Sequence, residues 1–111
     1  MITTHVLDVS RGRPAVGVRV ILDRRQAEGS WSELARGQTN ADGRLASLVQ
    51  AGSLMAGAYR LRFATGDYFA AMQVRGFYPE VEVVFVVDDA AGHYHVPLLL
   101  SPFGYTTYRG S

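Results

Sequence analysis

The chain has no cysteine and no lysine among its 111 residues, and each absence excludes a class of chemistry. Without cysteine there are no disulfides, no thiolate nucleophiles and no cysteine metal ligands. All 11 basic residues are arginine, so Schiff-base and lysine-nucleophile catalysis are excluded as well. A catalytic site in this chain has to rely on other side chains.

Long apolar runs and a charge excess are also missing. No stretch approaches the ~18 consecutive apolar residues of a membrane-spanning helix. The chain starts without the basic and apolar segments of a targeting signal. Its net charge is +1, which calls for neither nucleic acid nor an acidic membrane surface. We therefore expect a cytoplasmic protein with no nucleic-acid or membrane partner, with a removed leader as an open alternative.

Alternating apolar and polar residues predict that most of the chain forms strands. One segment, Asp67 to Arg75, has helical spacing instead, with Asp67 as its expected cap and Gly76 as its end. Ser47 to Gly57 is poorly patterned. Pro97 cannot donate to a ladder, so it indicates a bulge or a neighbour that does not need its N–H. The expected strands are Ile2 to Asp8, Val16 to Asp23, Trp31 to Thr39, a short strand from Arg44, Ala58 to Ala64, Glu80 to Asp88, His93 to Leu100 and Tyr105 to Gly110.

About eight short strands, one helix and turn signals every 8–12 residues or so are typical of a β-sandwich. At 111 residues we expect one all-β domain that covers residues 1–111. In the strand from Ile2, the residues Thr3, His5 and Leu7 share a face.

Three histidines, His5, His93 and His95, are the main candidates for chemistry. His93 and His95 are two apart, so they share one face of a strand, although the pattern does not say which face meets the core. One possibility is a three-histidine zinc site. Another is metal-free acid–base work, in which a neutral imidazole takes a proton from water and an arginine holds an anionic substrate. The third possibility is that these residues are ordinary surface histidines without a role in chemistry.

Arg44 is the arginine best placed for the second possibility. It directly follows the turn N-A-D-G at residues 40–43, where a rigid neighbour can direct a long side chain. A solvated turn arginine is the alternative. The pattern of residues does not decide between them.

Three segments together resemble the 5-hydroxyisourate hydrolases, the enzyme branch of the transthyretin-like family. They are T-T-H-V-L-D at residues 3–8 followed by G-R-P-A, T-N-A-D-G-R at residues 39–44, and the tail that ends in Y-R-G-S at residues 108–111. The resemblance covers nearly the whole chain in the family's order. The terminal Y-R-G-S is specific, because the related thyroid-hormone carriers lack it together with the matching histidines.

The resemblance implies a transthyretin-like sandwich that assembles as a homotetramer, with active sites at the interface between two dimers. It implies hydrolysis of 5-hydroxyisourate to 2-oxo-4-hydroxy-4-carboxy-5-ureidoimidazoline in urate breakdown, without cofactor or metal. Its catalytic residues would be His5, Arg44, His95 and Ser111, and its substrate-binding residues Arg44, Tyr108, Arg109, Gly110 and Ser111. Because the same fold also carries ligands without catalysis, a small-ligand binding or carrier module is the alternative function.

Overall fold

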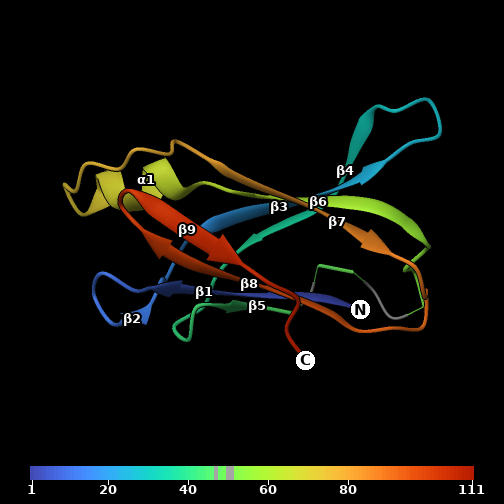
Figure 1. Cartoon of the computed structure of the whole chain (residues 1–111), viewed down its shortest axis with the longest axis horizontal. Helices are drawn as coiled ribbons and strands as arrows, with labels where there is room; N and C mark the ends of the chain where they lie inside the picture. The colour runs from blue at the N-terminus through green and yellow to red at the C-terminus, as the bar shows by residue number, and fades with distance from the viewer. Residues whose placement is uncertain (47, 50–51) are drawn as a thin grey trace.

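Two β-sheets pack face to face and enclose the core (Figure 1). The computed structural model describes residues 1–46, 48–49 and 52–111. One sheet has the order β2 (Arg13–Pro14), β1 (Ile2–Asp8), β8 (Tyr94–Ser101) and β9 (Gly104–Thr107), and β5 (Arg44–Leu45) also pairs with β1. The other has the order β4 (Trp31–Gln38), β3 (Arg19–Arg25), β6 (Gly57–Phe63) and β7 (Val81–Val87). With the helix α1 (Thr65–Ala71), the described residues confirm the predicted β-sandwich.

Alternation along the strands fills the space between the sheets. Every second residue of β1 is buried, beginning with Ile2, while the residues between them are partly exposed. The strand β8 places Tyr94, Val96, Leu98 and Leu100 in the core in the same alternation, and Pro97 between them is also buried. His95 therefore lies on the outer face of this sheet, which the sequence left undecided.

The helix differs from its predicted position. It spans Thr65–Ala71, two residues upstream of the expected start, and no side chain caps its first turn. Asp67 lies inside that turn and pairs with Arg19, 2.7 Å away, so it is not the cap. The helix ends before Gly76, because Gln73 takes a positive φ of 59°.

Other boundaries also shift. β3 begins at Arg19, three residues later than expected, and continues to Arg25. The two-residue strand β2 was not expected. β9 ends at Thr107, and only an isolated bridge between His95 and Gly110 continues toward the tail. Part of the poorly patterned stretch from Ser47 to Gly57 lies outside the described residues.

Pro97 sits in the middle of β8 without a bulge. The parallel pairing of β1 and β8 runs continuously through His5 and Pro97. The antiparallel ladder with β9 ends one residue later, at Leu98 and Thr107. Beyond that end the Thr107 hydroxyl donates to the Pro97 carbonyl at 2.8 Å, so no partner on β9 needs the missing N–H. This confirms the second interpretation of Pro97, a strand whose neighbour does not need its N–H, and not the bulge.

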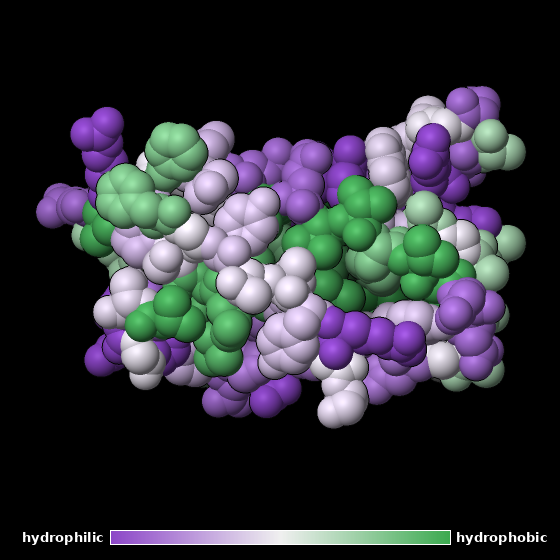
Figure 2. All heavy atoms as spheres, viewed as in Figure 1, coloured by the Kyte–Doolittle hydropathy of each residue, from purple (hydrophilic) through white to green (hydrophobic). Residues whose placement is uncertain are grey.

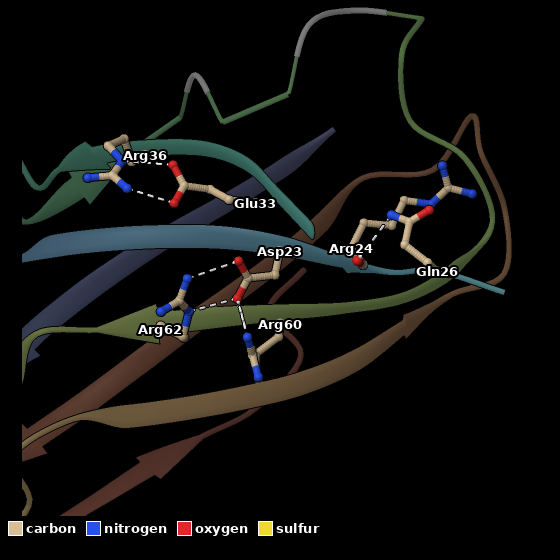
Figure 3. A network of polar contacts seen from close by, with 7 residues as sticks. All are labelled: Asp23, Arg24, Gln26, Glu33, Arg36, Arg60 and Arg62. Carbon is tan, nitrogen blue, oxygen red and sulfur yellow. Dashed lines mark hydrogen bonds and ion pairs between the residues drawn. The ribbon is translucent and has the colours of Figure 1, made fainter. Parts of the chain in front are cut away.

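A buried carboxylate joins the strands of the other sheet (Figure 3). The Asp23 side chain is 2% exposed and accepts hydrogen bonds from Arg60 and Arg62 on β6 at 2.7–3.1 Å. Burial alone would raise the pKa of Asp23, but the bonds and charges of Arg62 and Arg60 outweigh it and lower that pKa. The ion pairs of Asp23 with the two arginines therefore stabilise the fold at pH values above the pKa of aspartate in the unfolded chain, about 4. This contribution is lost as the pH falls through the pKa of Asp23 in the folded protein, which is lower.

We expect Arg62→Met to lower the free energy of unfolding by about 2 kcal/mol at neutral pH, because it leaves a buried carboxylate with fewer partners. Arg36→Met is the matched control, since Arg36 pairs with Glu33 in the open and should matter little. Chemical denaturation of the variants measures both effects. Equal losses from the two variants would contradict the assignment of a special role to Asp23.

None of the helices among the described residues is long and apolar enough to cross a membrane.

Candidate active site

Three neighbouring strands bring the candidate side chains to one outer face. The parallel register sets Thr3 of β1 beside His95 of β8, and His5 beside Pro97. On the other edge of β1, the antiparallel register sets His5 beside Arg44 of β5. Residues far apart in the sequence therefore meet because β1 lies between β5 and β8.

A hollow of about 240 Å³ opens on this face. It brings two imidazoles, a guanidinium and hydroxyl groups together with two apolar side chains, those of Leu45 and Ala46. Its lining residues are Thr3, Thr4, Arg44, Leu45, Ala46, His93, His95 and Ser111.

His95 is the half-buried centre of the pocket. Its Nδ1 lies 2.7 Å from the Thr3 hydroxyl. Burial lowers the pKa of His95, and the positive charges of Arg44, His5 and His93 lower it further. The imidazole is therefore held in its neutral form at neutral pH, which a proton acceptor requires.

His5 is oriented by the turn that precedes β5. Its Nε2 lies 2.9 Å from the carbonyl oxygen of Asp42. A carbonyl oxygen can only accept, so Nε2 of His5 carries the proton and Nδ1 is left as the acceptor when the ring is neutral. His5 does not line the hollow itself, but it lies beside Arg44 in the strand register and contributes to the lowered pKa of His95.

The turn before Arg44 is rigid. The side-chain oxygen of Asn40 accepts from the backbone nitrogens of Asp42 and Arg44 at 2.9 and 3.0 Å. Gly43 has a φ of +74°, and its carbonyl accepts from the nitrogen of Val6 at 2.8 Å. A Cβ at Gly43 would collide with the backbone of β1, so glycine is required where the turn docks. This docking fixes the backbone from which Arg44 projects into the pocket.

The tail reaches the pocket through one backbone contact. The nitrogen of Gly110 donates to the His95 carbonyl at 2.8 Å, and Ser111 then lines the hollow. A Cβ at Gly110 would lie only 2.6 Å from Cδ2 of His95. The absence of a side chain at this position lets the imidazole and the tail pack against each other.

Tyr108 and Arg109 do not join the histidine pocket within one copy of the chain. They line a different hollow of about 210 Å³, beside Val83 to Val86 of β7. The Arg109 guanidinium lies 4.6 Å from the ring centroid of Tyr94, a cation–π contact. The structure thus brings His5, Arg44, His95, Gly110 and Ser111 together and leaves the other two expected residues apart.

Two site residues were missed by the sequence reasoning. Thr3 was placed on the face of His5 but given no role, and His93 was a candidate for chemistry but not among the site residues that the resemblance implies. Thr3 lies on the same face of β1 as His5, and this much could be read from the sequence. Its position beside His95 depends on the parallel pairing of β1 and β8, which the sequence does not reveal. His93 lies 3.1 Å, by its Nε2, from the same Thr3 hydroxyl.

The three-histidine zinc alternative finds no geometric support in residues 1–46, 48–49 and 52–111. No group of three or more histidine, aspartate or glutamate side chains in these ranges lies close enough to hold a metal ion. Instead, one ring nitrogen of His5 is hydrogen-bonded to a backbone carbonyl, and one ring nitrogen of His95 is hydrogen-bonded to a hydroxyl.

Comparisons with known proteins match this chain to one family. The model of the HIUase/Transthyretin family matches residues 2–110. A 5-hydroxyisourate hydrolase of Caulobacter vibrioides is 49% identical over 115 residues, which cover 99% of this chain and 97% of the relative. The solved structure of Klebsiella pneumoniae 5-hydroxyisourate hydrolase has a TM-score of 0.87 and 40% identity, with 99% and 97% of the two chains covered. Transthyretin from Sparus aurata has a TM-score of 0.93 and 35% identity, with 98% and 95% covered.

Proposed function

This chain belongs to the HIUase/Transthyretin family, and we propose that it is an enzyme that hydrolyses 5-hydroxyisourate in purine catabolism. The product is 2-oxo-4-hydroxy-4-carboxy-5-ureidoimidazoline. The observation that carries the proposal is a half-buried imidazole, its pKa lowered by burial, that shares one pocket with an arginine. The names of the relatives agree with that chemistry.

The reaction adds water to the C6 carbonyl of the six-membered ring and breaks the N1–C6 bond. In our proposal His95 takes a proton from the attacking water at Nε2, the ring nitrogen that Thr3 does not occupy. Arg44 donates N–H groups to the carbonyl oxygen as negative charge develops there. The proton on His95 then passes to the departing N1. The carbon side of the broken bond becomes the carboxylate, and the nitrogen side becomes the ureido group.

His5, Ser111 and Gly110 complete the proposed site. His5 is paired with Arg44 in the strand register, and its Nδ1, the nitrogen that Asp42 does not bind, can accept from substrate or from a second water. Ser111 supplies a polar group at the pocket wall, and Gly110 lets the tail approach His95 closely. No cofactor takes part in this scheme.

We propose that the active form is a homotetramer with its pockets between dimers. In support, the side of the sandwich between β7 and β9 is apolar and open (Figure 2). Val84 and Val86 of β7 are 59% and 68% exposed there, and Tyr108 is 54% exposed. β7 and β9 are also edge strands with unpaired backbone groups. If Tyr108 and Arg109 contact substrate, as the resemblance implies, that contact needs a pocket completed by another copy.

The function is tested by the absorbance decay of freshly generated 5-hydroxyisourate with and without the protein. We expect the protein to accelerate the decay in proportion to its concentration. A carrier module of the same fold would bind the compound and leave its decay unaccelerated, which would overturn the proposal.

Arg44→Lys is expected to lower kcat/KM by about tenfold to a hundredfold. The variant keeps the positive charge but loses the planar fork that can grip two oxygens at once. Steady-state kinetics measure the loss, and Arg13→Lys, an exposed arginine of β2 outside the pocket, is the matched control. Parental activity in the Arg44 variant would show that charge alone suffices.

A further inference from the structure

One hydroxyl group links two histidines in the pocket. The Thr3 Oγ1 lies 2.7 Å from Nδ1 of His95 and 3.1 Å from Nε2 of His93. The two imidazole rings themselves are 6.4 Å apart between centroids, so the hydroxyl is the connection between them. It lies there because the parallel register sets Thr3 beside His95, while His93 precedes the strand by one residue.

A threonine hydroxyl has one proton and can donate to only one of the two rings. In one arrangement it donates to His93 and accepts from the N–H at Nδ1 of His95. The Nε2 of neutral His95 then carries a lone pair. In the other arrangement it donates to Nδ1 of His95 and accepts from His93. Neutral His95 then carries its proton on Nε2 and cannot take one from water.

The surroundings favour the first arrangement. Arg44 lines the same pocket and has only donor groups, so an imidazole nitrogen that faces it is favoured as an acceptor. The charges that lower the pKa of His95 are those of Arg44, His5 and His93, and no side chain that lines the hollow in the described part of the chain is a carboxylate. His93 is exposed, so its Nδ1 can keep a proton on the solvent side while its Nε2 accepts from Thr3.

We propose that Thr3 and His93 are positioning residues that select the Nδ1–H tautomer of His95 and so leave Nε2 free to accept a proton. This role rests on the proposed hydrolase function, and it gives His93 a part that the sequence did not indicate. Neither residue needs to touch the substrate. They act by fixing where the proton of the neutral imidazole resides, and the orientation of the ring follows from the same bond.

The direct test is 15N NMR of the histidine rings in the free protein, labelled at histidine. The signals of His95 are those that are missing from the spectrum of His95→Asn. In the parent protein at neutral pH, we expect Nδ1 of His95 to have the shift of a protonated nitrogen and Nε2 that of an unprotonated one. In Thr3→Val, a change of similar shape without the hydroxyl, we expect the Nε2–H form to dominate. Thr3→Ser should restore the parental pattern.

Kinetics provide the second readout. Thr3→Val should lower kcat by about tenfold to a hundredfold, the usual effect of losing a group that orients a functional histidine. KM should change less than threefold or so, because no substrate contact is lost, and Thr3→Ser should recover most of kcat. Ser32→Ala is the control: it removes an exposed hydroxyl from β4, in the other sheet, away from the rings. It should leave both the NMR pattern and kcat near parental values.

His93→Phe tests the other end of the link. It removes the acceptor for the Thr3 proton, so the hydroxyl is expected to turn to His95 and shift its tautomer in the same direction as Thr3→Val. A parent protein whose His95 carries its proton on Nε2, or a Thr3→Val variant with an unchanged tautomer, would overturn the proposal. Because the NMR pattern is read without substrate, failure of the tautomer proposal is distinguishable from failure of the hydrolase assignment.

Discussion

Replacing His95 with asparagine is expected to lower kcat/KM for 5-hydroxyisourate by roughly 10²–10⁴-fold, the range for a positioned acid or base. Asparagine is close in size and polar, and the position is on the outer face of β8, so the core is untouched. The variant should therefore keep a cooperative thermal transition. Turnover near the parental rate in a folded His95→Asn protein would remove this residue from the mechanism.

The pH dependence of the parent enzyme should agree with that assignment. Activity requires neutral His95, so it is lost as pH falls through the pKa of that imidazole. Burial, and then the charges of Arg44, His5 and His93, place this pKa below the ordinary histidine value of about 6.5. The acid limb of kcat/KM, which reports the free enzyme, is expected below that pH, and a limb well above it would point to another base.

Gly110→Ala is expected to cost about a hundredfold in kcat/KM, because a small displacement of a positioned group is enough for such a loss. The added methyl group would approach Cδ2 and Cγ of His95 at 2.6 and 3.3 Å, so the imidazole has to move. It would not enter the core, and the fold should survive. Kinetics and a thermal melt on the same preparation separate the two effects.

Gly104→Ala is the control for this prediction. A Cβ at Gly104 would meet only the Ser101 hydroxyl, at an ordinary 3.7 Å, and the residue lies at the far end of β9 from the pocket. It should retain parental kinetics. Equal effects of the two substitutions would mean that tail geometry near His95 is unimportant.

Most of the sheet positions were predictable because strands such as β1 and β6 have a burial pattern with a period of two. Tyr59, Leu61 and Phe63 alternate with arginines along β6, and the structure buries all three aromatic and aliphatic side chains. The helix boundary was not predictable in this way. Asp67 has the chemistry of a cap, but Thr65 is buried with its hydroxyl donating to the Tyr78 carbonyl, and that tertiary contact draws the helix start upstream.

The sequence marked part of the candidate site, and the site residues themselves stay a prediction. His5, Arg44 and His95 were named from segments that resemble one family, and the structure brings them to one face. The link from Thr3 to His93 was not accessible, because it depends on the register of two strands about 90 residues apart in sequence. The position of Arg109 over Tyr94 was missed for a similar reason, since the tail leaves the ladder after Thr107.

The most direct test of metal-free hydrolysis at His95 is turnover of 5-hydroxyisourate in large excess over protein that has been dialysed against a chelator. We expect the parent protein to consume the whole excess in many cycles per chain, added zinc not to speed the reaction, and His95→Asn at the same concentration to fall close to the spontaneous rate. Consumption limited to about one equivalent per chain would indicate a carrier, and activity that is lost to the chelator and restored by zinc would indicate a metal site; either result would contradict metal-free hydrolysis at His95.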